Sequence, residues 1–401
     1  MKHLIPLAFA GCLLAFTHVA QGQQRLTGRV VDASTGQPVP YASIGVLRTT
    51  LGTTSNAEGE FELRNVPLPG RLVVSELGHG RDTVAITASS ASQLLQVRLT
   101  PTSVLLPEAL VGSYAAELIA QAYRELRRTN AQKTYGQAFY RQTTRLDNDV
   151  TEVQEMVWHA QTSNARVDGT ALAQGRFAKK KALISFKDFS LYTKAVTFFD
   201  TQDDSATYQG IISLHTADKF KLNVQSVVQN GPQQLVEIGL TPLDPASRTR
   251  QGSVVIDAAT HQILRVRLAT TGIHTKSNNP VFKFKDELTQ LEFVFGPRPG
   301  GAAALEYLKI NYQASMGRPL KSDFNVQVDS FAYFYNGKPG PASGITYAPA
   351  KGGEADLAAI KQTTYDPAFW RDNPVVKRTP LEEETMRAFE QKGAFGTLLT
   401  P

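Results

Sequence analysis

Hydrophobic and polar residues alternate in several short runs near the N-terminus. In the clearest run, Leu95, Val97 and Leu99 are separated by polar residues. Such alternation is typical of a β-strand that buries one face, and the glycines, prolines and asparagines between the runs favour turns. We predict a seven-stranded type of β-sandwich over residues 23–101. The expected strands are 26–32, 41–47, 53–56, 61–63, 72–74, 84–86 and 95–99.

A helical pattern follows at residues 114–128. Leu118, Ala122 and Leu126 recur at four-residue intervals, which would place them in an apolar stripe along one side of a helix. We therefore predict a linker and helix over residues 102–130.

Strand-like runs return after Thr134, and short polar turns separate them. This pattern is typical of antiparallel sheets. The turn between Asp257 and Thr260, for example, joins two alternating runs. We predict an antiparallel β-rich domain over residues 131–340, so the chain as a whole is expected to be mainly β. The expected strands are 136–144, 150–160, 191–199, 208–214, 220–228, 234–240, 252–256, 263–269, 282–295, 305–314 and 320–335.

The hairpin around Asp257 resembles the half-barrels of periplasmic lipoprotein-carrier proteins. This resemblance implies a concave sheet that could hold an acyl chain. A purely structural hairpin is the alternative.

Aromatic residues mark the C-terminal tail, residues 341–401. We expect Tyr365, Phe369 and Trp370 to anchor this tail on the β-rich domain, because aromatic side chains bury large areas. A short helix is expected to begin after Thr379, which is suited to cap it.

The chain begins with a pattern typical of a secretory signal peptide over residues 1–22. A basic start at Lys2 precedes a mostly apolar run, and small residues precede a predicted cut after Gly22. A membrane-anchoring helix is disfavoured, because the run is shorter than the ~20 apolar residues that span a bilayer. Lipidation at Cys12 is a further alternative. After the predicted cut no cysteine remains, which suits the oxidising bacterial periplasm.

The glycine and proline positions of the first domain carry a family resemblance. The residues concerned are Gly28, Val30, Asp32, Gly36, Pro38, Pro40, Ala42, Thr54, Gly59 and Phe61. This set resembles the carboxypeptidase regulatory-like domain, a transthyretin-like β-sandwich that also precedes the plug of TonB-dependent outer-membrane receptors. The two-domain layout is similar to that of secreted Gram-negative envelope proteins. The resemblance implies the regulatory-like module and not a peptidase.

Candidate chemistry is sparse. We find no nucleophile elbow, phosphate loop, dinucleotide fingerprint or metal-ligand set in its required context, and we predict no catalytic, cofactor-binding or metal-binding residue. The acids at 203–204 and 382–384 are interpreted as solvated. His79 is interpreted as a loop histidine, and the lysines at 179–181 as a solvated turn. A formal charge of +6 over 401 residues is too small to indicate nucleic-acid binding.

Together these features predict a non-enzymatic exported protein that acts by binding or assembly at the periplasmic side of the outer membrane. An envelope protein or a lipid is the expected partner, and no transmembrane helix is expected in the mature chain. The alternative is a periplasmic carrier of an apolar ligand or lipid in a half-barrel. A hydrolase with an unfamiliar site, marked by acids or histidines that converge in a cleft, is a third class.

Overall fold

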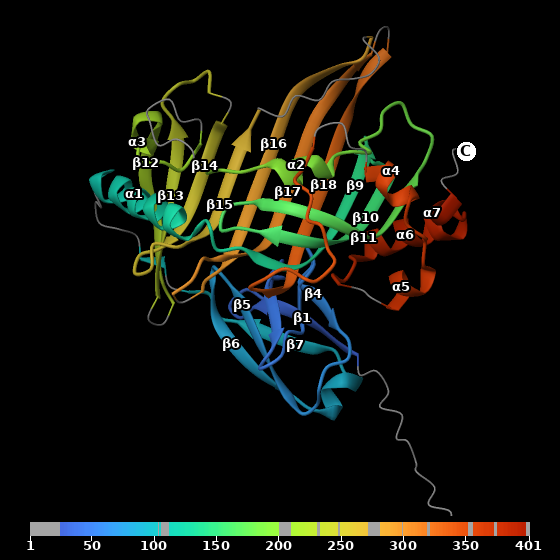
Figure 1. Cartoon of the computed structure of the whole chain (residues 1–401), viewed down its shortest axis with the longest axis horizontal. Helices are drawn as coiled ribbons and strands as arrows, with labels where there is room; N and C mark the ends of the chain where they lie inside the picture. Colours follow the sequence, from blue (N-terminus) through green and yellow to red (C-terminus); the bar gives the residue numbers. More distant parts are fainter. Residues whose placement is uncertain are drawn as a thin grey trace, which may run out of the picture.

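The structure is a computed structural model and describes residues 25–102, 104–105, 112–199, 210–230, 233–247, 249–271, 281–298, 300–318, 321–351, 356–372 and 375–397. The predicted leader with Cys12 lies outside these residues, as do Asp203 and Asp204. Figure 1 shows a small β-sandwich below a large, strongly twisted sheet. No helix of the described residues has the length and apolar character needed to cross a membrane.

The N-terminal sandwich consists of two small sheets, with strand orders β4-β1-β7 and β3-β2-β5-β6. Val30, Ile44 and Phe61, from both sheets, are buried in its common core. The predicted seven-stranded sandwich is confirmed. Its strands are β1 (Leu26–Asp32), β2 (Ser43–Val46), β3 (Gly52–Thr54), β4 (Glu60–Leu63), β5 (Gly70–Glu76), β6 (His79–Ile86) and β7 (Leu95–Leu99), and the short helix η1 (Ala88–Ser92) precedes β7.

Two of the glycines that carry the family resemblance have different physical roles. Gly59 has a φ of 75°, and a Cβ there would lie 2.5 Å from the carbonyl oxygen of Val30, so the turn requires glycine. Gly28 lies within β1 rather than in a turn, and a Cβ would lie 2.4 Å from the ring of Phe61. Its role is therefore to let that ring approach the backbone.

Within the described residues, the large sheet has eleven strands in the order β11-β10-β9-β18-β17-β16-β15-β14-β13-β12-β8. All of its pairings are antiparallel, as predicted, and β11 and β8 are the strands at its two ends. In Figure 1, β10 and β11 run across the steep strands β16 and β17, which shows how strongly the sheet twists. Its strands are β8 (Val104–Leu105), β9 (Thr134–Leu146), β10 (Asp149–Thr162), β11 (Val167–Lys179), β12 (Phe220–Asn230), β13 (Gln233–Pro242), β14 (Thr249–Asp257), β15 (Ile263–Thr270), β16 (Lys283–Gly296), β17 (Ala304–Arg318) and β18 (Lys321–Lys338).

One face of the large sheet is covered by helices α1 (Gly112–Thr129), α2 (Ser190–Ala195) and α3 (Thr216–Lys219). Ile119 of α1 and Phe198, after α2, are buried in one core with Ile238 and Phe293 of the sheet. Rings interlock in this core, for the centroids of Phe198 and Phe293 lie 5.2 Å apart. Helix α1 confirms the helix predicted at 114–128. The apolar face of the sheet is thus filled by protein side chains.

Three strand predictions in this region were wrong or incomplete. Residues 191–199 form most of α2 and a connecting segment, and the described part of 208–214 forms turns. Aromatic residues are typical of strands, which explains the prediction. In the structure, Phe189 and Phe198 are instead buried in the core beneath the sheet, because tertiary packing overrides strand propensity. Strand β11 was missed, because its several glycines and alanines have low strand propensity.

Four short helices near the C-terminus gather beside β10 and β11 (Figure 1). As predicted, Trp370 anchors the tail, since it is buried with Phe139, Val157 and Tyr333. Thr379 caps the predicted helix and forms a capping box. The helices are α4 (Asp356–Lys361), α5 (Pro367–Asp372), α6 (Pro380–Gln391) and α7 (Ala394–Thr397).

Removal of a core ring tests whether the helix-covered face is as tightly packed as its contacts indicate. We expect Phe293→Ala to lower the free energy of unfolding by about 3–5 kcal/mol, because the ring leaves a cavity. Exposed Leu183 provides the control, and Leu183→Ala should change it by less than about 0.5 kcal/mol. Urea denaturation measures both. A loss near zero for Phe293→Ala would contradict a filled face.

Candidate functional site

The sandwich contacts the large sheet at two separate points, and the first is Tyr41. Its φ of 57° lies in the left-handed region, which residues with a side chain seldom adopt. Its ring stacks on Phe331, with a centroid distance of 5.1 Å, and lies 5.7 Å from the ring of Tyr307. The ammonium of Lys309 lies 4.7 Å from the Tyr41 ring centre, a favourable cation–π geometry. Tyr41 thereby fixes one side of the interface.

The second contact combines an apolar side chain with a chain of charges. Leu77, in the turn between β5 and β6, packs on a buried cluster of the large sheet that includes Leu264. Beside it, Arg265 donates to the Glu76 carboxylate at 2.7 Å. The other oxygen of Glu76 lies 2.7 Å from Nδ1 of His79, whose Nε2 lies 3.1 Å from Asp32. This row of charges links β1 to the large sheet.

The charges of this row shift one another's pKa values. Burial by itself would raise the pKa of Glu76, but the hydrogen bond to His79 and the charge of Arg265 outweigh it and lower the pKa to about 2. The hydrogen bond to Glu76 in turn raises the pKa of His79 above its ordinary value, with burial opposing the rise. The two carboxylates on either side of His79 therefore favour its protonated form.

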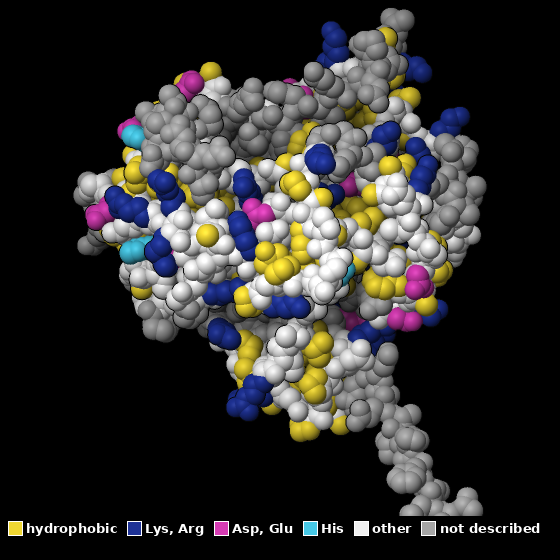
Figure 2. Space-filling model, in the orientation of Figure 1, with side chains coloured by type: hydrophobic (Ala, Val, Ile, Leu, Met, Phe, Trp, Pro, Cys, Tyr) yellow, Lys and Arg dark blue, Asp and Glu magenta, His cyan; other side chains and the backbone are white. Residues whose placement is uncertain are grey.

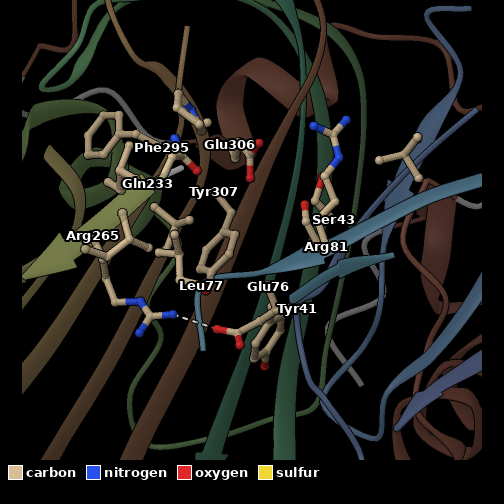
Figure 3. Close-up of a pocket in the computed structure, with 18 of the residues that line it drawn as sticks. Tyr41, Ser43, Glu76, Leu77, Arg81, Gln233, Arg265, Phe295, Glu306 and Tyr307 are labelled. Atoms are coloured by element: carbon tan, nitrogen blue, oxygen red, sulfur yellow. Dashed lines mark hydrogen bonds and ion pairs between the residues drawn. The ribbon is translucent and has the colours of Figure 1, made fainter. Parts of the chain in front are cut away.

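A cleft of about 860 Å³ lies between the two contacts. Figure 3 shows Tyr41, Ser43, Glu76 and Arg81 of the sandwich opposite the strands of the large sheet. The sandwich wall includes Ser43, Gly45, Arg48, Val73, Ser75 and Arg81, and the sheet wall includes Gln233, Leu235, Leu264, Val294, Glu306 and Tyr307. On the face shown in Figure 2, lysine and arginine side chains gather along the boundary between sandwich and sheet. The cleft therefore has a mixed polar and apolar lining that includes Arg48, Arg81 and Arg265.

The cleft exists because the sandwich presents small side chains to the sheet. Ile44 and Leu72 point into the sandwich core, whereas the alternate positions Ser43, Gly45 and Ser75 line the cleft. No atom lies within 4 Å of the place where a Cβ of Gly45 would be. A side chain at this position would therefore enter empty space.

Glu306 reaches the cleft through a β-bulge. Val294 of β16 pairs with Tyr307, and Phe295 pairs with Leu305, so Glu306 has no partner on that strand. A bulge of this kind redirects side chains, and both Glu306 and Tyr307 line the cleft. Glu306 also lines an adjoining cavity of about 260 Å³. Burial raises the pKa of Glu306 to about 7, although the charge of Arg298 opposes the rise.

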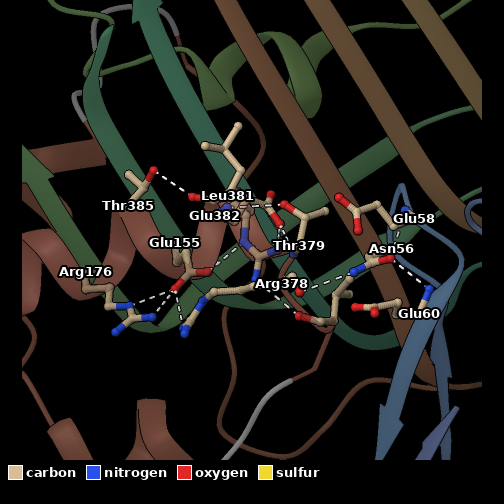
Figure 4. A network of polar contacts seen from close by, with 12 residues as sticks. Asn56, Glu58, Glu60, Glu155, Arg176, Arg378, Thr379, Leu381, Glu382 and Thr385 are labelled. Atoms are coloured by element: carbon tan, nitrogen blue, oxygen red, sulfur yellow. Dashed lines mark hydrogen bonds and ion pairs between the residues drawn. The ribbon is translucent and has the colours of Figure 1, made fainter. Parts of the chain in front are cut away.

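The C-terminal segment 375–379 ties the sandwich to the large sheet at the end of the interface near Tyr41. The hydroxyl of Thr53 donates to the backbone carbonyl of Val375 at 2.7 Å. The side-chain amide of Asn56 donates to the backbone carbonyl of Arg378 at 3.2 Å. Lys377 forms an ion pair with Glu60 at 2.9 Å. Figure 4 shows this segment between the sandwich and the strands of the sheet.

A buried carboxylate fixes the same segment from the other side. Glu155 of β10 is 1% exposed and forms ion pairs with Arg141 of β9, Arg176 of β11 and Arg378. Burial by itself would raise the pKa of Glu155, but the three arginines hold it well below its usual range. Arg176 also lies over the ring of Trp370, 4.6 Å from its centre. The network in Figure 4 thus locks the tail that holds the sandwich.

The residues singled out in the sequence are placed as follows. The interpretation of His79 as a loop histidine is corrected, because it begins β6 and contacts two carboxylates. The acid Glu76, three residues earlier in the chain, was the sequence feature that could have indicated an ion pair with His79. Glu382 pairs with Arg141, and Lys180 pairs with Asp149. Among the described residues, no group of three or more histidines, cysteines or acids is arranged to hold a metal ion.

Sequence reasoning gave no indication of Glu306 or of the arginine cluster around Glu155. The first depends on a bulge, and the second joins residues that are far apart in the chain.

Comparison with known proteins confirms the resemblance of the first domain. Residues 26–111 match the family model of the CarboxypepD_reg-like domain. No curated protein matches the chain.

Several solved structures align with parts of this chain at low similarity. A domain described as an outer membrane lipoprotein-sorting protein, from Vibrio parahaemolyticus, is 11% identical over 59% of this chain and 95% of that one, with a TM-score of 0.26. A LolA superfamily protein from Nitrosomonas europaea is 11% identical over 56% and 94%, with a TM-score of 0.23. The structure of the MucA/MucB complex of Pseudomonas aeruginosa is 12% identical over 57% of this chain and 100% of that one, with a TM-score of 0.18.

Loss of the Glu155 charge should release the tail. In Glu155→Gln the buried arginines lose their common counter-ion, and breaking a buried pair costs about 3–5 kcal/mol. We expect faster amide hydrogen exchange in α6 and a lower free energy of unfolding. Glu384→Gln, a matched change at an exposed position of α6, should have neither effect. Unchanged exchange in α6 would contradict the role of Glu155.

The charge row at the interface predicts a pH dependence. Glu76 stabilises the fold above its ordinary pKa of 4.5, and this contribution is lost as pH falls towards 2. His79 stabilises below 6.5, and its contribution is lost as pH rises through its raised pKa. The Tm advantage of the natural protein over His79→Gln should therefore shrink above pH 6.5. His159→Gln is the control, and a constant difference between pH 5 and 9 would refute the prediction.

Proposed function

We propose that this chain is a non-enzymatic, exported envelope protein that binds its ligand or partner in the cleft between the sandwich and the large sheet. It would act by binding or assembly at the periplasmic side of the outer membrane. The observation that carries this proposal is a cleft of about 860 Å³ with walls from two units that are locked together. Ligand sites commonly lie between domains and have volumes of about 300–1,000 Å³.

The filled core favours binding in the cleft over transport of a lipid beneath the sheet. A half-barrel carrier needs an apolar cavity on the helix-covered face of its sheet. In the described residues, Phe186, Phe189 and Phe198 occupy this face and contact rings of the sheet. The periplasmic location is supported by the leader pattern and by the lack of cysteine after residue 22.

The lining of the cleft also favours binding over turnover. A serine nucleophile needs a general base within hydrogen-bond reach. Ser43 and Ser75 line the cleft, but no histidine of the described residues does. Glu76 already accepts hydrogen bonds from Arg265 and His79. Glu306 on the sheet wall and Arg48 and Arg81 on the sandwich wall lie across the cleft from one another. Such an arrangement suits recognition of a bound molecule.

Occlusion of the cleft tests the proposal. We expect Gly45→Phe to fold with an unchanged Tm, because the new side chain enters empty space. Affinity capture from envelope extracts, with identification of both proteins and lipids, measures binding. A protein or lipid that the natural protein captures should be absent from the Gly45→Phe sample. Gln96→Phe, on the opposite sheet of the sandwich, should retain it. Equal recovery by Gly45→Phe, or recovery of one stoichiometric lipid by all three, would overturn the proposal in favour of a carrier.

A further inference from the structure

We propose that the cleft recognises a peptide segment by two charges, with a lysine ammonium bound at Glu306 and a carboxylate bound at Arg48 and Arg81. This inference rests on the proposed function and specifies its ligand. Its basis is a pair of unmatched charges of opposite sign on the two walls of one cavity.

The negative charge is that of Glu306. Its carboxylate forms no hydrogen bond or ion pair with any described residue, and it lies against the backbone of Gly296, where a Cβ would come within 2.4 Å of its oxygen. Arg298 influences it only from a distance, since the Arg298 guanidinium donates to Thr134. A partly desolvated carboxylate without a counter-ion is costly. A cation from a ligand would remove this cost, and the bulge directs the carboxylate towards the space where such a ligand would lie.

The positive charges lie on the sandwich wall. Arg48 and Arg81 are exposed, and neither pairs with an acid among the described residues. Arg265, on the sheet wall, differs from them because it is already paired with Glu76. Arg48 and Arg81 are therefore available to bind a carboxylate, and guanidinium groups suit carboxylates in particular. No ion pair joins either arginine to Glu306 within the described chain, so the gap between the charges is left to the ligand.

The lining between these charges favours a peptide over a lipid. Ser43, Ser75 and Gln233 offer hydrogen-bond donors and acceptors for peptide groups. Leu77, Leu235 and Leu264 supply apolar surface beside these polar groups, which suits the aliphatic part of a lysine side chain. Two acyl chains would need a continuous apolar wall, which these polar residues interrupt. A short peptide with a lysine and an acid at a fixed spacing matches both the charges and the polar lining.

The test uses the full mature chain and a set of fluorescently labelled, end-blocked peptides. Each peptide carries one lysine and one aspartate separated by zero to three alanines. Matched peptides replace lysine by glutamine or aspartate by asparagine. Fluorescence anisotropy gives the affinities. We expect one spacing to bind best, and removal of either charge to weaken binding about tenfold or more, as for a charge-assisted hydrogen bond.

Protein variants assign each charge to its residue. Glu306→Gln should bind the lysine and glutamine peptides equally and weakly. It should still bind the aspartate peptide more tightly than the asparagine peptide. The double variant Arg48→Gln with Arg81→Gln should bind the aspartate and asparagine peptides equally. It should still bind the lysine peptide more tightly than the glutamine peptide. Glu384→Gln and Arg124→Gln, exposed positions in α6 and α1, should bind like the natural protein. Tm measurements verify that every variant is folded.

Two results would overturn the inference. The first is full discrimination between lysine and glutamine by Glu306→Gln. The second is binding of vesicles containing phosphatidylethanolamine, whose head group also carries an ammonium and an anion, with no binding of any peptide. In either case the capture experiment with Gly45→Phe decides separately whether the cleft is the binding site.

Discussion

The arrangement of the two β units depends on one buried carboxylate, Glu155. A charge in a protein interior is tolerated only when counter-charges surround it, and here they come from β9, β11 and the C-terminal segment. Because Arg378 must reach Glu155, the segment 375–379 is held against the sheet. The same segment bonds to Thr53, Asn56 and Glu60 of the sandwich. A requirement for charge neutralisation in one place therefore fixes the position of a separate unit.

A second consequence is that the cleft is held open rather than closed. The sandwich rests on Tyr41 at one side and on Leu77 and the Glu76–Arg265 pair at the other. Between these supports the sandwich presents serine and glycine, which are too small to reach the sheet. The gap is thus a product of side-chain size at alternating strand positions. Glu306 faces this gap partly desolvated and without a counter-ion, which is costly in the free protein and is the reason for our proposal of a cationic ligand group there.

The two faces of the large sheet have different roles. One is filled by helices and aromatic rings, and it gives the sheet its stability. The other carries the sandwich, the charge row and the cleft. A resemblance to half-barrel carriers would direct attention to the first face, but the carboxylate of Glu306, which has no partner among the described residues, lines the cleft on the second. Packing and charge, rather than the shape of the sheet, are the reasons why we propose binding on the second face.

The sequence by itself determined the elements whose cause is local. Alternation and turn glycines defined the sandwich, four-residue spacing defined α1, and Thr379 marked the start of α6. Residues 191–199 were misjudged because burial of Phe198 beneath the sheet, and not local propensity, decides their conformation. The cleft and its charges were decided only by tertiary structure. The bulge at Glu306 depends on the register of two strands, and Glu155 meets Arg378 across 223 positions of chain. Long-range contacts of this kind leave no periodic signal, because the pattern of a sequence reports only what neighbouring residues do together.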